Sequence, residues 1–268
     1  MRVVFSIILN GKHHLLHHNQ ADFILSHCDY WIVVEGASLP NGSTSWCKSF
    51  PESFHHNGGS VDGTRDYLSE LASHHSHLIY IPSNGFWHSK DVQVNIAIQK
   101  LKELTDRCFL WEMDIDEHWT TADMAQAEHE LVTRKLKMGR FRADCYVGKH
   151  LKAIGDWGES YTLGYNRLWQ WKGESFKTHE PPVLKGTWWS RDAILTPRFR
   201  HYNYYFEWDV KFKDQWYGDV DRIYERWVHI NSLPKEAFPL PISSLITGYW
   251  GRTNSQIIWE DTPPPLIR

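Results

Sequence analysis

Two aspartates separated by one residue, Asp114 and Asp116, are the side chains best suited to chemistry in this chain. They follow a short apolar run that is typical of a buried strand. In an extended chain alternate side chains share a face, so the two carboxylates are expected to lie together. Carboxylates held this close repel unless a cation lies between them. Because Mg²⁺ and Mn²⁺ take oxygen ligands, often together with substrate phosphates, the spacing predicts a metal–nucleotide site. A solvated acidic turn is the alternative.

The elements that must position these aspartates alternate along the first half of the chain. Apolar, β-branched runs predict strands at residues 3–9, 30–34, 78–81 and 108–113. Helices are predicted at residues 15–26, at 65–73, where Asp62 or Thr64 can cap the start, and at 90–104, where apolar residues recur at helical spacing. Strands that alternate with helices favour a Rossmann-type α/β fold, a mainly parallel sheet with helices on both faces.

Polar side chains follow three of these predicted strands directly. They are Asn10, Glu35 and Asp114. Ligands of open parallel sheets bind outside the carboxyl ends of the strands, so all three residues are expected along one edge. This convergence is stronger evidence for a site than any of the short motifs alone.

The second half of the chain has a different composition, richer in aromatic, strand-like segments. A helix is predicted from residue 123 to about 138, followed by aromatic, strand-like segments at residues 140–147, 162–171, 188–189 and 199–206. An amphipathic helix is predicted at residues 219–230, and a Pro-rich tail follows from residue 233. We place a boundary at residue 215, with residues 216–268 packed as a helix and tail on the larger part.

Composition excludes several classes of protein. The chain has 268 residues, 29 basic against 32 acidic, and no basic tract, so nucleic acid is a poor candidate partner. Four cysteines occur without a Cys-x-x-Cys pair, which favours a reducing compartment over a disulfide framework. No apolar run is long enough for a signal peptide or a membrane span. These features predict a soluble, cytoplasmic protein, with peripheral membrane contact left open.

Aromatic and histidine residues are unusually frequent. Fifteen Trp, with 12 Tyr and 12 Phe, supply flat apolar faces on which sugars can stack, although most of these rings are expected in the core. The segment 13–18 holds four histidines, a pattern that can bind metal adventitiously.

The ordered set of motifs resembles glycosyltransferases of the GT-A fold, particularly family 2 and its relatives. The resemblance covers roughly residues 3–120 and rests on an order rather than on one motif. It consists of a strand ending at Asn10, Trp31-Ile-Val-Val-Glu-Gly-Ala-Ser38, Gly59-Ser-Val-Asp-Gly-Thr64, Asn84-Gly85, Lys90, Asn95 and Asp114-x-Asp116-Glu117.

This chain departs from the family pattern in three places. Gly11 stands where an acidic residue usually follows the first Asn, and Glu35 replaces the usual Asp. About two dozen residues separate Glu35 from the Asp-Gly-Thr element, which puts Asp62 in doubt as a nucleotide contact. Capping of the following helix is at least as good a role for Asp62.

The resemblance implies roles for individual residues. Asp116 would bind Mn²⁺ or Mg²⁺ directly, and Asp114 would reach the nucleotide ribose or a metal-bound water. Glu35 would meet the base of a UDP- or GDP-sugar, with Asn10, Lys90 and Asn95 as further donor contacts. Such enzymes often take a third metal ligand from a later histidine, for which we favour His201 over His179.

Transfer with inversion also requires a carboxylate that takes the proton of the acceptor hydroxyl. Glu180 is our first choice, because the two prolines after it restrict the local backbone. Asp156 and Glu159, which flank Trp157 in a Gly-rich loop, are the alternatives.

The sequence therefore favours a metal-dependent glycosyltransferase that acts on a glycan or other hydroxyl acceptor. Residues 1–215 would form the catalytic domain, with a nucleotide-sugar half at 1–120 and an aromatic-rich acceptor half at 121–215. A sugar nucleotidyltransferase is one alternative, although the first loop lacks its Gly-rich, basic character. A non-catalytic carbohydrate-binding protein is the other, but it leaves the acidic residues at one edge unexplained.

Overall fold

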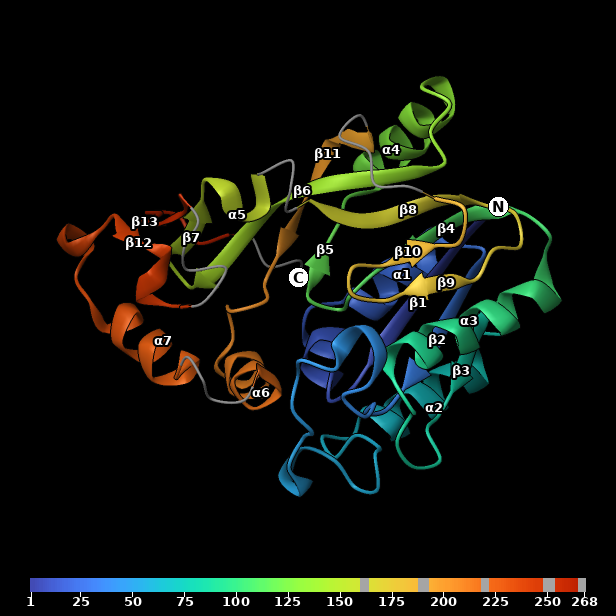
Figure 1. Cartoon of the computed structure of the whole chain (residues 1–268), viewed down its shortest axis with the longest axis horizontal. Coiled ribbons are helices and arrows are strands. Elements are labelled where there is room, and N and C mark those ends of the chain that lie inside the picture. The colour runs from blue at the N-terminus through green and yellow to red at the C-terminus, as the bar shows by residue number, and fades with distance from the viewer. Residues whose placement is uncertain (160–163, 188–192, 218–221, 248–253, 265–268) are drawn as a thin grey trace.

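The computed structural model describes residues 1–159, 164–187, 193–217, 222–247 and 254–264. The fold is mixed α/β, with a central sheet flanked by helices, and the four strands from the first half of the chain run parallel within it (Figure 1). Its first half alternates as predicted, in the order β1 (Arg2–Ile8), α1 (Gln20–His27), β2 (Tyr30–Glu35), α2 (Thr64–His74), β3 (Leu78–Ile81), α3 (Lys90–Leu104) and β4 (Cys108–Glu112).

The parallel part of the sheet has the order β3-β2-β1-β4. The register places Ile8 beside Glu35 and Phe5 beside Glu112. The carboxyl ends of all four strands therefore meet at one edge, which is the edge that carries Asn10, Glu35 and Asp114.

Helices cover both faces of these strands because side chains alternate along each strand. Val3 and Phe5 of β1 pack in one buried cluster with Val94 and Ile98 of α3. The intervening residue, Val4, packs in another cluster with residues of α1 and α2. The two clusters fix the sheet between the helix layers.

Antiparallel strands extend the sheet beyond β4. They are β8 (Tyr165–Trp171), β6 (Met138–Gly148), β7 (Leu151–Ile154), β13 (Gln256–Trp259) and β12 (Leu240–Pro241), in that order. The segment after residue 215 thus contributes two strands to one end of the same sheet. A separate hairpin of β9 (Phe176–Thr178) and β10 (Val183–Leu184) contacts α3.

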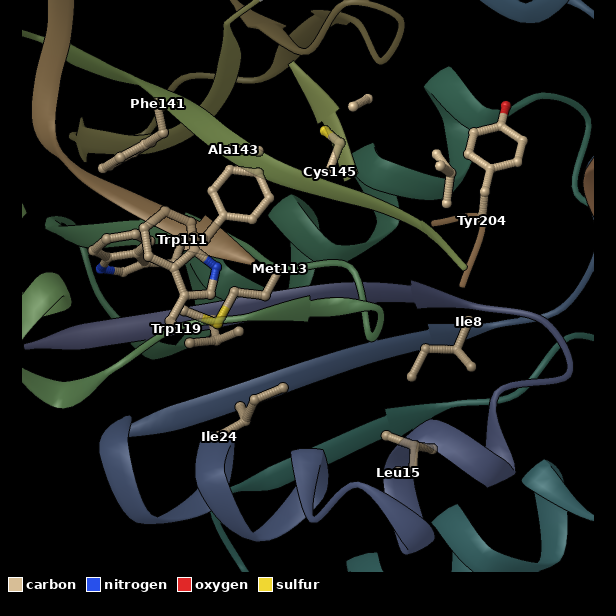
Figure 2. Packing of buried hydrophobic residues seen from close by; sticks show 14 of the residues in the cluster. Ile8, Leu15, Ile24, Trp111, Met113, Trp119, Phe141, Ala143, Cys145 and Tyr204 are labelled. Carbon is tan, nitrogen blue, oxygen red and sulfur yellow. The ribbon is translucent and has the colours of Figure 1, made fainter. Parts of the chain in front are cut away.

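An aromatic core lies between these strands and α4 (Thr121–Thr133). The rings of Trp111 and Trp119 meet edge to face at 5.1 Å, and Phe141 packs on both (Figure 2). All three side chains are fully or almost fully buried. Many of the aromatic residues noted in the sequence are therefore core residues, as expected.

A short crossing pair of strands connects the acidic segment to the second half of the chain. β5 (Glu117–His118) runs antiparallel to β11 (Ile194–His201), which also runs parallel to β6. The register pairs His201 with Glu117. After β11 the chain forms α6 (Glu207–Tyr217) and α7 (Ile223–Ser232), and the short helix α5 (Asp156–Glu159) packs on β6 and β7.

The predicted elements agree best with the structure in the first half of the chain. The strand at 78–81 and the helix at 90–104 match to the residue. The aromatic segment 199–206 was predicted as a strand, but β11 ends at His201 and α6, which the sequence did not predict, begins at Glu207. The predicted strand at 188–189, the start of the strand at 162 and the start of the helix at 219 lie outside the described residues.

Across the described ranges, no helix combines the length and the apolar character needed to cross a membrane.

Candidate functional site

Asn10 and Glu35 meet at the predicted sheet edge through the loop that precedes α2. Asn10 N donates to Ser60 Oγ (3.0 Å), and Ser60 N donates to Glu35 Oε1 (2.7 Å). The Glu35 side chain is fully buried, and Arg65 Nε lies 3.3 Å from its Oε2. The Asn10 side chain also holds this loop, since its Oδ1 accepts from Val61 N. In this structure both side chains hold the loop before α2 by accepting hydrogen bonds from its backbone. Their contact with a donor molecule stays a prediction.

Asp62 bonds the start of α2, close to the capping role that the sequence left open, although Gly63 occupies the N-cap position itself. Its Oδ1 accepts from Thr64 N (3.0 Å), at the first residue of α2. Its Oδ2 accepts from Lys12 N, which ties the loop after β1 to the start of α2.

The acidic segment is a turn rather than the extended strand end that we predicted. Ser6 Oγ donates to Met113 O (2.7 Å), and Glu117 N donates back to Asp114 O (3.0 Å). The chain must turn here because β4 pairs with β1 and β8, whereas Glu117 starts β5, which pairs with β11 instead. As a result Asp114 and Asp116 face different cations.

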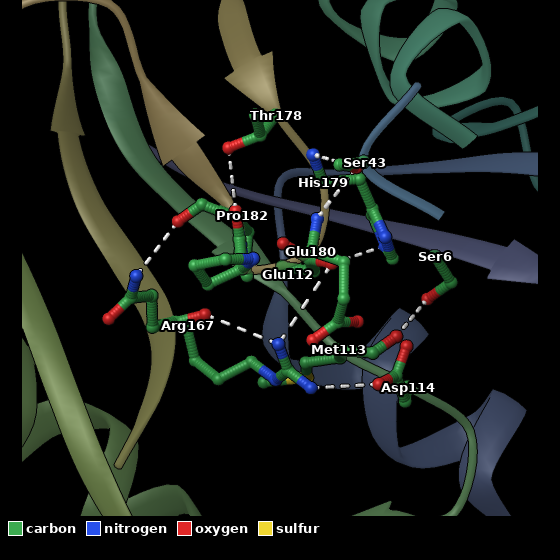
Figure 3. Close-up of polar contacts among 12 residues, drawn as sticks. Ser6, Ser43, Glu112, Met113, Asp114, Arg167, Thr178, His179, Glu180 and Pro182 are labelled. Carbon is green, nitrogen blue, oxygen red and sulfur yellow. Dashed lines mark hydrogen bonds and ion pairs between the residues drawn. The ribbon is translucent and has the colours of Figure 1, made fainter. Parts of the chain in front are cut away.

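Arg167, on β8, is the cation that faces Asp114. Its Nη2 lies 2.8 Å from Asp114 Oδ2, and its Nε and Nη2 both bond Glu117 Oε1, at 2.9 and 2.7 Å (Figure 3 shows Arg167 with Asp114). Sequence reasoning missed this residue. The available signal was a lone charge in a strand whose other side chains are aromatic, apolar or amide, Tyr165–Trp171.

Burial and charge act against each other in this cluster. Burial raises the pKa of the fully buried Glu117 to about 8, with further contributions from Asp114 and Asp116, while Arg167 opposes the rise. Burial would lower the pKa of Arg167, but Glu117, Asp114 and Glu112 outweigh it and hold that pKa above its ordinary value. The segment is therefore rich in carboxylates relative to the positive charge facing it.

His179 and Glu180 lie against the same cluster. His179 Nε2 is 3.2 Å from Glu112 Oε1, and Arg167 Nη1 is 3.9 Å from that oxygen (Figure 3). The backbone of this segment is held from the other side, since His179 N donates to Asp91 Oδ1 and Glu180 N donates to Ser43 Oγ. Glu180 is exposed. A carboxylate predicted as the catalytic base thus lies on a segment that packs on the acidic cluster.

Asp116 faces an imidazole and an ammonium group. His201 Nε2 lies 3.6 Å and Lys213 Nζ 3.7 Å from Asp116 Oδ2. Burial would raise the pKa of Asp116, but His201, Lys213 and His14 outweigh it and hold that pKa well below its ordinary value. Of the two histidines considered in the sequence, His201 is therefore the one beside Asp116.

The remaining ring nitrogen of His201 is also engaged. Its Nδ1 lies 3.3 Å from the hydroxyl of Tyr165, which is on the same strand as Arg167. A fixed second nitrogen orients the ring and leaves Nε2 directed at Asp116.

A divalent metal fits the pair of Asp116 and His201 better than it fits Asp114. Asp116 and His201 present an oxygen and a nitrogen toward each other at a distance that a shared ion could bridge after a small shift. Asp114 has a side chain 40% exposed, but one of its oxygens is bonded to Arg167. The pair of Asp116 and His201 is therefore the part of the predicted ligand set that fits a metal.

Lys90 and Asn95, both on α3, have other neighbours. Lys90 Nζ lies 5.3 Å above the ring of Trp216. The amide of Asn95 bonds the backbone of Phe176 at both ends, as Nδ2 donates to Phe176 O (3.1 Å) and Phe176 N donates to Oδ1 (2.9 Å). Its second N–H goes to Asp91 O. The structure assigns Asn95 to anchoring β9.

Replacing Asn95 with alanine is expected to lower the free energy of unfolding by about 1 to 3 kcal/mol, because buried backbone groups of Phe176 lose their partners. Urea unfolding of both proteins measures this difference. Gln126→Ala, on the exposed side of α4, is the control and should change stability by less than about 0.5 kcal/mol. Equal stability of Asn95→Ala and wild type would contradict the anchoring role.

Asp156 lies in a different neighbourhood. It begins α5, and its Oδ2 accepts from Asn254 N (3.1 Å). Within the described ranges, this hydrogen bond connects Asp156 to the C-terminal segment rather than to the acidic cluster. Of these two carboxylates, Glu180 is therefore the one that lies beside the acidic cluster.

A surface hollow of about 530 Å³ lies away from all these residues. Its lining comes from the end of α3 and the turn after β8, including Lys102 and Trp171. Trp171 pairs with Cys108 at the start of β4, so the hollow is at the amino end of that strand, opposite the acidic segment. We do not assign it to the site.

The candidate site thus comprises Asp114, Asp116 and Glu117 with Arg167, Lys213 and His201 around them, and the segment of His179 and Glu180 above. Comparison with protein-family models and with curated proteins finds no match to this chain.

Proposed function

We propose that this chain is a metal-dependent glycosyltransferase of the GT-A type, which moves a sugar from a nucleotide-sugar donor to a hydroxyl acceptor. One observation carries the proposal. At the carboxyl edge of a parallel sheet, Asp116 faces both an imidazole and an ammonium group, and Asp114, two residues away, pairs with Arg167. Such an edge is where open α/β sheets bind nucleotides.

The chemistry of transfer demands positive charge at this edge. The leaving group is a nucleoside diphosphate, whose negative charge grows as the bond to the sugar breaks. When bound by Asp116 and His201, a divalent metal supplies a Lewis acid for that charge. Lys213 and Arg167 are protein cations already in place, and Lys213 keeps a pKa above its ordinary value because Asp116, Tyr217 and Asp209 outweigh the effect of burial. Together they would stabilise the departing diphosphate.

Proton removal from the acceptor falls to Glu180 in this proposal. Its carboxylate is exposed, and its backbone is fixed by Ser43 beside the acidic cluster. An accessible carboxylate held next to the donor phosphates is what an inverting transfer requires of a general base.

Thermal unfolding with nucleoside diphosphates tests the donor site directly. UDP and GDP are added separately to the metal-free protein, each with and without Mn²⁺. We expect one nucleotide to stabilise the protein only when Mn²⁺ is present, by about 2.7 kcal/mol at one hundred times its dissociation constant. Asp116→Asn should lose the shift, whereas Asp156→Asn should keep it.

The outcomes separate the proposal from its alternatives. Absence of any shift at millimolar nucleotide would overturn the donor site. A shift with a nucleoside triphosphate and sugar phosphate, accompanied by pyrophosphate release, would instead identify a nucleotidyltransferase.

A further inference from the structure

A second cluster of potential metal ligands lies beside the acidic segment, on residues that the proposed reaction does not use. After β1 the chain forms a π-helical turn, His13–His17. Leu15 is buried in the core and its backbone N donates to Gly11 O (3.1 Å), which fixes the rotation of the turn. His13 and His14 consequently both face α6. π-Helical turns are rare and occur frequently at functional sites.

Both imidazoles meet a single carboxylate, Asp209, in the first turn of α6. His13 Nε2 lies 3.2 Å from Asp209 Oδ1, and His14 Nε2 lies 2.9 Å from Asp209 Oδ2. A ligand atom from each of the three residues lies within 4.8 Å of the others, and within the described ranges this is the one group of at least three His, Cys, Asp or Glu residues that meets this criterion. The side chains are 27%, 2% and 14% exposed, in the order His13, His14, Asp209.

His14 Nε2 forms a hydrogen bond with Asp209 Oδ2, but two other ring nitrogens of the cluster lack one. His14 Nδ1 is buried and has no hydrogen-bond partner among the described residues. His13 Nε2 is also buried without one, because its approach to Asp209 is close but poorly directed for a hydrogen bond. Phe206 packs edge to face against both rings and excludes water from that side. The two nitrogens directed at the Asp209 carboxylate, His13 Nε2 and His14 Nε2, suit a metal ion as a common partner in such surroundings.

The donor set indicates which class of metal would bind. Two imidazoles and one carboxylate are the ligands of Zn²⁺ and similar borderline ions, whereas Mg²⁺ and Ca²⁺ prefer oxygen alone. Tetrahedral Zn²⁺ with bonds of about 2.0–2.1 Å separates its donors by about 3.3 Å. The two histidine–carboxylate distances of 3.2 and 2.9 Å are close to that value.

We propose that His13, His14 and Asp209 form a site for one Zn²⁺-class ion, distinct from the pair of Asp116 and His201. The ion ties the turn after β1 to α6. One turn further along α6, Lys213 faces Asp116, so the bound ion also fixes the helix that brings this ammonium group to the acidic segment.

Direct metal binding to the full chain tests the site. Protein freed of metal by a chelator is titrated with Zn²⁺ by calorimetry, and bound metal is counted by elemental analysis after dialysis. We expect one tight Zn²⁺ per chain, with affinity reduced more than about 100-fold in both His14→Gln and Asp209→Asn. Excess Mg²⁺ should not displace it.

Control variants separate this site from surface histidines and from the proposed donor site. His74→Gln and His129→Gln remove exposed imidazoles and should retain the tight site. Asp116→Asn should retain it as well, so the site stands or fails independently of the glycosyltransferase proposal. Unchanged affinity in His14→Gln and Asp209→Asn, or no tight binding to the wild type, would overturn the inference.

A measurement on the wild type alone keeps the test valid if the variants do not fold. Co²⁺ in a four-coordinate N,N,O site gives strong visible absorption, whereas six-coordinate Co²⁺ on surface groups absorbs weakly. We expect strong bands that saturate at one Co²⁺ per chain and disappear when Zn²⁺ is added. Weak absorption without saturation would contradict the site.

Discussion

Replacing Arg167 with methionine is expected to lower the free energy of unfolding at pH 9 by about 3 to 5 kcal/mol, the usual cost of leaving a buried charge without its partner. The partner is Glu117, whose side chain is fully buried and which Arg167 bonds through two nitrogens. Methionine keeps much of the volume of arginine, so loss of charge rather than a cavity dominates the effect. Urea unfolding at pH 6 and pH 9 measures it.

The loss should be larger at pH 9 than at pH 6. Folding raises the pKa of Glu117 from its ordinary value of 4.5 to about 8. The protein therefore loses stability as the pH rises from the unfolded pKa through the folded pKa, because the folded state holds this proton more tightly. That folded value is about 8 with Arg167 present, and removal of the arginine raises it further. Near pH 6 Glu117 is already mostly protonated in the wild type, so the variant leaves little unpaired charge. At pH 9 the wild-type carboxylate is mostly ionised, and the variant must either leave it unpaired or bind a proton at a cost.

Two controls define the origin of the effect. In Arg167→Met/Glu117→Met both charges are removed, and most of the lost stability should return, because the fully buried carboxylate that Arg167 bonds is gone and Glu112 keeps His179 at 3.2 Å. Lys100→Ala breaks an exposed ion pair with Glu103 and should cost less than about 1 kcal/mol. Wild-type stability of Arg167→Met at pH 9 would show that the buried pair contributes little.

Replacing Asp116 with asparagine is expected to reduce turnover of the donor about 1,000-fold if the proposed function holds. Asparagine preserves size but removes the charge that faces His201 and Lys213. Loss of a metal-binding carboxylate removes several kcal/mol of transition-state stabilisation, and each 1.36 kcal/mol is about tenfold in rate. Release of nucleoside diphosphate from UDP- and GDP-sugars with Mn²⁺ measures the rate.

Asp144 supplies a matched control for this substitution. It is a partly buried carboxylate that also faces two cations, Lys152 at 3.1 Å and Arg198 at 2.8 Å, but it lies on β6 outside the candidate site. Asp144→Asn should keep turnover within about twofold of wild type. Full activity of Asp116→Asn with Mn²⁺ present, in protein that is folded by circular dichroism, would remove Asp116 from the mechanism.

The sequence by itself determined the alternating half of the fold and the edge at which its polar residues gather. The strand at 78–81 and the helix at 90–104 were predicted to the residue because each has a clear local pattern, an apolar run in one case and apolar residues at helical spacing in the other. Parallel topology then follows from the alternation, and it places Asn10, Glu35 and Asp114 at one edge without further information.

Only the tertiary structure decided which side chains at that edge remain free to act. The buried carboxylate of Glu35 faces Arg65, and the amide of Asn95 is engaged with Phe176, although both residue types suit a ligand contact equally well in the sequence. A hydrogen-bond partner distant in sequence leaves no trace in local periodicity. Asp114 and Asp116 also separate in a turn because β5 must pair with β11, a strand that begins more than 70 residues later.

The cations of the site were likewise settled by tertiary structure. Lys213 reaches Asp116 from α6, a helix whose aromatic-rich sequence did not indicate helical structure. Arg167 reaches Asp114 because β8 pairs antiparallel with β4, and His201 rather than His179 lies beside Asp116 because β11 is in register with β5. The sequence thus determined where the acidic residues of the site lie, because they follow strands that local patterns reveal. Long-range strand pairing decided the positive charges that face them, since register between distant segments is set by packing and not by local pattern.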